Sequence, residues 1–254
     1  MATIASPAIR IYRRPSARFD ALREALDRGA FHVVRPPDAM ADWECVDDKG
    51  TRVRCAGGAL LVEAGSEALA DAFDAQFRIA LPSEHAIPDG GPPPQRVEVI
   101  AGSDESGKGD RAYALAVAAV LVPCAREHDA LLRGVRDSKA CAARDVRDLS
   151  WWIQQEFACE VRVIPPETRD QVLHRHGGNE SRLLAAMHAE CLCALRARHG
   201  FLLTRVDRFA QGRPVAVLVT RGYSEMLIDE CVRGERHVAV AAASIVARSL
   251  AQPS

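Results

Sequence analysis

The chain has 254 residues, 48% of them hydrophobic, which is enough for two domains that each bury a core. Its formal net charge of −1 excludes a protein that holds nucleic acid through a basic surface spread over the whole molecule. Residues 1–14 lack the sustained apolar core of a signal peptide, and no apolar run has the length of a membrane span. We therefore expect a cytoplasmic protein, with no membrane and no protein partner implied.

Residues 1–84 predict a small α+β domain. Apolar residues recur there at helical spacing in two segments, and Gly50 supplies the positive φ that a tight hairpin turn requires. No group of residues in this domain indicates catalysis, so we expect it to bind or orient a substrate. The expected elements are a helix at 17–28, an extended stretch at 31–34, hairpin strands at 43–46 and 52–55, a strand at 59–62 and a helix at 66–77.

Residues 85–95 are rich in proline and glycine, which favours an extended linker over a helix or a strand. The second domain, residues 96–254, alternates strands with helices and so predicts an α/β sheet flanked by helices. Acidic residues follow its first and last predicted strands. The expected elements are strands at 97–100, 112–122, 159–164 and 201–206, and helices at 127–135, 145–157 and 181–198.

Residues 102–110, Gly-Ser-Asp-Glu-Ser-Gly-Lys-Gly-Asp, directly follow a predicted strand and allow two interpretations. As a phosphate-binding P-loop they place Lys108 correctly, but Gly109 stands where Ser or Thr would bind magnesium. The carboxylates of Asp104 and Glu105 would also repel the phosphate. The second interpretation, which we favour, takes these carboxylates as ligands for divalent metal beside a flexible glycine-containing loop.

The second interpretation gains support from five ordered motifs that resemble those of the ribonuclease HII/HIII family. Residues 104–109 match Asp-Glu-x-Gly-x-Gly, residues 137–139 match Asp-Ser-Lys, and residues 206–209 resemble an Asp-x-Phe strand end. Residues 239–248 are similar to the Ala-Ala-Ser-Ile-x-Ala-Arg helix. Residues 179–188 resemble the HIII-type segment Asn-x-Asn-x-x-Leu-Ala-x-x-His, with Ser181 in place of the second Asn.

The resemblance implies a ribonuclease H-like mixed sheet flanked by helices, preceded by a small α+β domain similar to the TATA-binding protein. It also implies an endoribonuclease that cleaves the RNA strand of RNA–DNA hybrids and leaves 5′-phosphate and 3′-hydroxyl ends. Phosphodiester hydrolysis of this kind uses Mg²⁺ or Mn²⁺, commonly as two ions. The implied catalytic and metal-binding residues are Asp104, Glu105, Asp207 and Glu235, and the implied substrate-binding residues are Gly107, Lys108, Gly109, Ser138, Lys139 and Ser244.

The spacing of the fourth acid, Glu235, differs from the family pattern. The family's acid lies ten residues before the serine equivalent to Ser244, whereas Glu235 lies nine before it. A one-residue loop deletion would still bring Glu235 to the metal. Glu230, Asp229 and Glu225 remain alternatives.

Two departures from the family pattern leave other functions open. Tyr113-Ala114-Leu115 stands where the family has a Gly-Pro pair, and the chain ends six residues after Arg248, where family members continue with further helices. We therefore expect a catalytic domain shortened at its C-terminus. The alternatives are a catalytically impaired relative that only binds nucleic acid and, more remotely, a P-loop NTPase.

Overall fold

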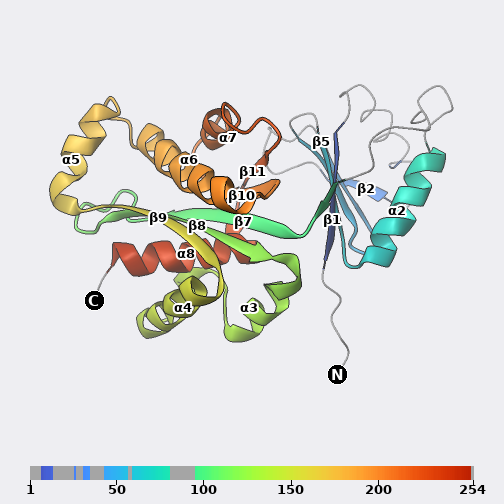
Figure 1. The fold of residues 1–254 in the computed structure, drawn as a ribbon, viewed down its shortest axis with the longest axis horizontal. Coiled ribbons are helices and arrows are strands. Elements are labelled where there is room, and N and C mark those ends of the chain that lie inside the picture. The colour runs from blue at the N-terminus through green and yellow to red at the C-terminus, as the bar shows by residue number, and fades with distance from the viewer. Residues whose placement is uncertain are drawn as a thin grey trace. The chain divides into compact units, whose positions relative to one another are not determined.

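A computed structural model describes residues 7–13, 26, 31–34, 43–56, 59–80 and 95–252. The chain divides into two units, Met1–Glu98 and Val99–Ser254, each with its own sheet and helices (Figure 1). We describe each unit by itself. No helix within these described ranges is both long enough and apolar enough to cross a membrane.

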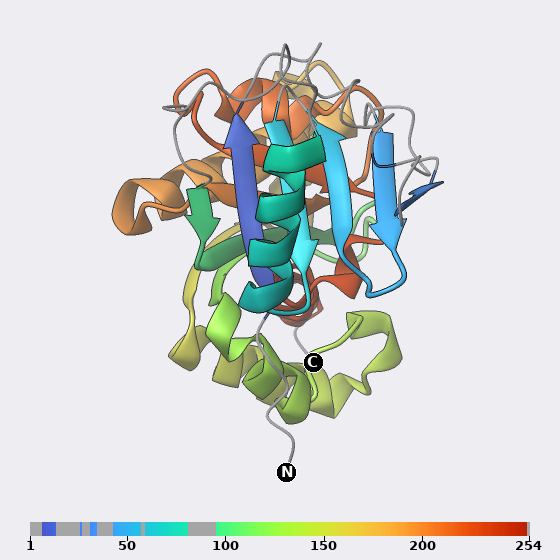
Figure 2. The same cartoon turned by 90° about the vertical axis from the view of Figure 1, so that its right-hand side faces the viewer.

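The first unit contains a six-stranded antiparallel sheet in the order β2-β3-β4-β5-β1-β6. Helix α2 packs against β1 and β5 and lies across one face of this sheet (Figure 2). Its Ala70 and Phe73 are buried against the sheet, which explains its amphipathic pattern. The elements are β1 (Ala8–Arg13), β2 (Phe31–Val34), β3 (Trp43–Asp47), β4 (Arg52–Ala56), β5 (Ala59–Ala64), α2 (Glu67–Ala80) and β6 (Gln95–Val97).

The predicted hairpin is confirmed. Strands β3 and β4 pair with Cys45 opposite Val53, and Gly50 has a φ of 79° in the turn. The carboxylate of Asp47 accepts hydrogen bonds from the backbone amides of Lys49 (3.0 Å) and Thr51 (2.6 Å), which closes the turn. Of the helix expected at 17–28, only Leu26 lies among the described residues, and residues 85–94 of the expected linker lie outside them.

A buried arginine joins α2 to β1. Arg10 is 2% exposed, and its guanidinium contacts Glu67 (2.8 Å), Asp71 (2.6 Å) and Asp74. Burial lowers the pKa of Arg10, but the hydrogen bonds to Asp71 and Glu67 outweigh burial and the net change is upward. The hydrogen bond from Arg10 also lowers the pKa of Asp71. This cluster of three acids therefore surrounds a buried cation of the same unit.

The second unit is a mixed sheet, as predicted, with five strands in the order β11-β10-β7-β8-β9, of which β11 was not expected from the sequence. Strands β7, β10 and β11 are parallel to one another, whereas β8 and β9 are antiparallel to their neighbours. The strands are β7 (Val99–Ser106), β8 (Leu115–Pro123), β9 (Ala158–Ile164), β10 (Leu203–Asp207) and β11 (Leu227–Cys231).

Helices cover both faces of this sheet (Figure 1). Helix α6 packs on β7, β8 and β9 from one side, and α8 packs on β7, β8 and β10 from the other. Helix α7 lies beside α6, and α4 lies beside α8. The helices are α3 (Glu127–Arg133), α4 (Ala143–Glu156), α5 (Pro166–Arg175), α6 (Glu180–His199), α7 (Pro214–Val219) and α8 (Val238–Ala251), with short 3₁₀ helices η1 (Cys124–Arg126), η2 (Ser138–Ala140) and η3 (Gly234–Arg236).

Two sequence expectations about the first strand of the second domain are wrong. The strand expected at 97–100 is two strands, because Val97 pairs with β1 in the first unit and β7 begins at Val99. The acidic motif does not follow this strand but lies within it, since β7 stays paired with β8 as far as Ser106 opposite Ala116. Pairing with a long apolar neighbour outweighs the low strand propensity of Gly, Asp and Glu.

Candidate active site

Strand β7 directs its two acids to opposite faces of the sheet, because side chains alternate along a strand. Ser103 and Glu105 share the face on which α6 packs, and Gly102 and Asp104 share the α8 face. A Cβ at Gly102 would lie 2.0 Å from the backbone of Ala239 in α8. Glycine at this position therefore lets α8 approach β7 closely, beside Asp104.

The other acids arrive from the neighbouring parallel strands. Val206 lies in register with Ser103, so Asp207 at the end of β10 is next to the acidic end of β7. Glu235 lies in η3, after β11. The backbone amide of Gly234 donates a hydrogen bond to Asp207 Oδ1 at 2.7 Å. A Cβ at Gly234 would lie 2.9 Å from the Cα of Asp207, so a larger residue would disturb this approach.

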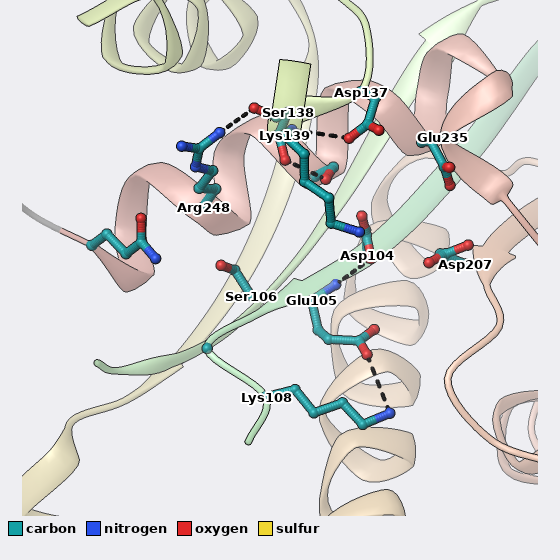
Figure 3. Close-up of a pocket in the computed structure, with 13 residues that line it drawn as sticks. Asp104, Glu105, Ser106, Lys108, Asp137, Ser138, Lys139, Asp207, Glu235 and Arg248 are labelled. Carbon is teal, nitrogen blue, oxygen red and sulfur yellow. Dashed lines mark hydrogen bonds and ion pairs between the residues drawn. The ribbon is translucent and has the colours of Figure 1, made fainter. Parts of the chain in front are cut away.

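A cleft of about 530 Å³ lies where these elements meet, and its side chains are drawn in Figure 3. Nine of the ten predicted site residues line it, and Gly109 is the exception. Asp137, Ser106, Arg248 and Gln252 also line the cleft, although the motifs alone had not assigned them to the site. The full lining is Asp104, Glu105, Ser106, Gly107, Lys108, Asp137, Ser138, Lys139, Asp207, Glu235, Ser244, Arg248 and Gln252.

The glycine-containing loop after β7 is held close to β8. Gly107 has a φ of 87°, and a Cβ there would lie 2.0 Å from the backbone oxygen of Ala114. Lys108 Nζ donates to the backbone oxygen of Phe209 (2.9 Å) and lies 3.8 Å from Glu105 Oε1. This loop leads into an antiparallel strand rather than a helix, so the P-loop alternative is wrong, because a P-loop needs a helix N-terminus at the phosphate.

The Asp-Ser-Lys segment is joined to Asp104 by hydroxyl groups. Ser138 Oγ lies 2.9 Å from Ser244 Oγ, and Ser244 in turn donates to the carboxylate of Asp104. Arg248 Nη1 donates to the backbone oxygens of Ser138 and Cys141. The arginine of the α8 motif therefore fixes the loop that presents Lys139, a role that the motif alone had not indicated.

The carboxylates of the cleft raise one another's pKa. Burial raises the pKa of Asp104 well above its usual value, and the charges on Glu105 and Asp207 add to this effect. Burial also raises the pKa of Asp207; the amide of Gly234 opposes the rise, while Glu235 and Glu105 add to it. The positive charge of Lys139 opposes part of this rise in the pKa of Asp207. The cleft thus concentrates negative charge that its own cations only partly balance.

Among the four candidates for the fourth acid, only Glu235 lines this cleft. Glu230 is 2% exposed and accepts a hydrogen bond from the amide of Ala216, and Asp229 lies 3.8 Å from the buried Arg205. Glu225 pairs with Arg196 at 3.0 Å. The shortened spacing before Ser244 therefore still brings an acid into the cleft.

The donor set of the cleft suits hard divalent cations, because it consists of carboxylate oxygens with hydroxyls nearby. Within the described ranges, however, no three His, Cys, Asp or Glu side chains are drawn together as they would be around a bound ion. Burial and neighbouring carboxylates raise the pKa values of both Asp104 and Asp207, so added positive charge would favour their ionised forms.

Comparisons with known proteins agree on one family. No family model matches the chain. The ribonuclease HIII of Protochlamydia amoebophila is 31% identical over 147 residues, which cover 58% of this chain and 48% of the relative. The ribonuclease HIII of Chlamydia trachomatis serovar D is 28% identical over 239 residues, which cover 91% of this chain and 75% of the relative. The chain spans about half the length of the first curated relatives it matches, at 48% and 50%.

The fold agrees with this relationship. The crystal structure of Bst-RNase HIII in complex with Mn²⁺ aligns with a TM-score of 0.50 and 22% identity, covering 94% of this chain and 79% of that chain. At this identity the alignment shows the fold alone. The second unit therefore has the ribonuclease H-like mixed sheet flanked by helices that the motifs implied.

Proposed function

We propose that this chain, a relative of the ribonuclease HIII proteins, is an endoribonuclease that cleaves the RNA strand of RNA–DNA hybrids and leaves 5′-phosphate and 3′-hydroxyl ends. The observation that supports this most strongly is the convergence of Asp104, Glu105, Asp207 and Glu235 on one cleft, from β7, β10 and the turn after β11. A cytoplasmic location belongs to the proposal, since such hybrids form where bacterial DNA is copied and transcribed.

Mg²⁺ or Mn²⁺ is the cofactor that these residues fit, and we propose two ions. The four carboxylates would hold them, and Asp104 is the buried member of this set. When bound, such ions supply Lewis-acid stabilisation of the negative charge that develops on phosphate during hydrolysis. The related Bst-RNase HIII has been crystallised in complex with Mn²⁺, which supports the choice of ion.

The remaining lining residues suit recognition of the substrate. Gly107 keeps the backbone free of side-chain bulk at the cleft, where a ribose 2′-hydroxyl would be distinguished from deoxyribose. Lys139 is exposed at the rim and Lys108 is about one-third exposed, so both ammonium groups can reach phosphates. Ser138 and Ser244 orient Asp104 through their shared hydrogen bond. Gly109 contributes flexibility beside the cleft rather than a contact.

We further propose that the first unit binds the hybrid, as the resemblance to a TATA-binding-protein-like domain implies. We expect this unit to contribute to affinity for the hybrid and not to the cleavage step. Replacing exposed cations of this unit, such as Arg96 (63% exposed side chain), with Gln should then raise the KM for the hybrid and leave kcat unchanged.

The test is cleavage of a labelled RNA–DNA hybrid with Mg²⁺ or Mn²⁺, with a single-stranded RNA of the same sequence as the substrate control. We expect Asp104→Asn and Glu235→Gln each to cleave the hybrid more than about 100-fold more slowly than the wild type. This loss is larger than that expected for residues that only support metal ligands. The matched control is Glu225→Gln, an acid paired with Arg196 away from the cleft, which should leave cleavage unchanged.

Each outcome discriminates between functions. Undiminished cleavage by Asp104→Asn would refute the site. Loss in Asp104→Asn with full activity in Glu235→Gln would remove Glu235 from the ligand set. Hybrid binding without cleavage by the wild type would favour the second candidate, a catalytically impaired relative that only binds nucleic acid; the departure at Tyr113-Ala114-Leu115 favours it.

A further inference from the structure

His188 is the last residue of the HIII-type segment 179–188, and the proposed function leaves it without a role. It lies in the middle of α6 and is fully buried, at 0% exposure. Both ring nitrogens nevertheless have polar partners, and both partners come from the same face of β7. Nδ1 lies 2.7 Å from Ser103 Oγ, and Nε2 lies 3.2 Å from Glu105 Oε2.

The direction of the bond to Glu105 follows from the available hydrogens. The Glu105 carboxylate has no hydrogen to donate, so Nε2 of His188 donates to it. Ser103 Oγ, which also donates to the backbone oxygen of Ala118 at 2.8 Å, lies against Nδ1 on the other side of the ring. This bond fixes the plane of the ring and directs Nε2 at the carboxylate of Glu105.

The ring is also fixed against the end of β10. His188 stacks on Phe209, with ring centroids 5.0 Å apart and an interplanar angle of 8°. Phe209 follows Asp207 by two residues, and its backbone oxygen accepts the hydrogen bond from Lys108. One buried imidazole thus contacts the β7 strand that presents Glu105 and the segment that follows Asp207.

We propose that His188 is a positioning residue that holds the Glu105 carboxylate at the wall of the cleft, ready to bind a divalent ion. This inference rests on the proposed function and adds to it a residue from outside the cleft lining. Any buried histidine needs polar partners, but one of the two partners here is Glu105, an acid that lines the cleft. Partners of metal-binding side chains commonly act in this way.

Two substitutions separate the contacts of the ring. The side-chain amide nitrogen of Gln reaches about as far as Nε2, so His188→Gln retains a donor for Glu105 and loses the bond to Ser103. The side-chain amide of Asn corresponds in position to Nδ1, so His188→Asn retains a hydrogen-bonding group for Ser103 and loses the bond to Glu105. Both variants lose the same aromatic stacking on Phe209, so each is a control for the other.

The primary measurement is Mn²⁺ affinity of the full chain by isothermal titration calorimetry, with urea unfolding of the metal-free protein beside it. We expect His188→Asn to weaken Mn²⁺ binding about tenfold and His188→Gln to stay within about threefold of the wild type. Their free energies of unfolding should be similar. In the hybrid cleavage assay, His188→Asn should lower kcat more than it raises KM, and His188→Gln should recover most of the loss.

Equal Mn²⁺ affinity in the wild type and His188→Asn would overturn the inference. So would equal losses in both variants, because packing would then be the only role. If neither variant folds, Ser103→Ala decides: it frees the ring while leaving His188 in place, and unchanged Mn²⁺ affinity would contradict the positioning role. A wild type that binds Mn²⁺ but fails to cleave hybrid would refute the proposed function and leave this inference to the calorimetric result.

Discussion

The two units treat clustered acids in opposite ways. In the first unit, Glu67, Asp71 and Asp74 gather around the buried guanidinium of Arg10, which lowers the pKa of Asp71. In the second unit, Asp104 and Asp207 lie beside further acids, and the pKa of each is raised. Acids that pack around a buried cation stabilise the fold, whereas buried acids that lie beside one another are suited to receive a cation from outside.

The largest expected effect comes from removing the internal cation of the first unit. Arg10→Met would leave three acids around a buried apolar side chain. We expect a loss of about 2–3 kcal/mol in the free energy of unfolding, below the usual cost of breaking a buried pair because Glu67 and Asp71 are more than half exposed. Urea unfolding of the full chain measures this loss.

The matched control for that change is Arg96→Met. Arg96 lies 3.9 Å from the same Glu67, but its side chain is 63% exposed. Its loss should change stability by no more than about 0.5 kcal/mol. Similar losses of unfolding free energy in the two variants would contradict a stabilising role for the contacts of Arg10 with the three acids.

The next prediction concerns the orientation of the Asp207 carboxylate in the cleft. Gly234→Ala would add a Cβ 2.9 Å from the Cα of Asp207 and disturb the amide that bonds to its carboxylate. We expect cleavage of the hybrid to fall about tenfold, in the range for partners of metal ligands. Gly222→Ala, where a Cβ meets nothing within 4 Å and the backbone does not have a positive φ, is the control for adding a methyl group at a glycine, and it should leave cleavage unchanged.

How far the sequence predicted this site depends on what each residue needs from the rest of the chain. Asp207 is the last residue of β10, so the strand expected at 201–206 sufficed to place it at the end of a strand. Glu235 was proposed by spacing but needed the short turn at Gly234 to reach the cleft. Strand β1 was not predicted at all, because its six residues become a strand only through pairing with β5 and β6.

Contacts between distant segments account for the remaining differences. The extension of β7 through the acidic motif depends on pairing with β8, and the loop-fixing role of Arg248 depends on η2 lying beside α8. His188 was noted within a motif, yet nothing local indicated that its ring reaches Glu105, 83 residues away in the chain. The family motifs indicated which residues gather, and the structure supplied the directions of their side chains.

Added Mn²⁺ should stabilise the acidic cluster of the second unit and not that of the first unit. At Mn²⁺ tenfold above its dissociation constant, the wild type should gain about 1.4 kcal/mol in the free energy of unfolding. Asp104→Asn should gain less, because one ligand charge is missing, while Asp71→Asn should gain as much as the wild type. An equal gain in all three proteins would show that Mn²⁺ binds elsewhere.

The smallest effect is a difference in pH dependence, measured by urea unfolding of the metal-free protein between pH 4 and 8. The folded state raises the pKa of Asp104, so it retains a proton that the unfolded chain releases above a pKa of about 3.9. The free energy of unfolding contributed by Asp104 therefore falls as pH rises from the unfolded pKa through the folded one. Asp71, whose pKa is lowered, contributes with the opposite sign: its stabilisation is present above the unfolded pKa and is lost as pH falls through the folded one. Asp104→Asn should consequently be more stable than the wild type near pH 7 and lose this advantage toward pH 4, whereas Asp71→Asn should be less stable near pH 7; parallel curves for the two variants would contradict the contrast between the clusters.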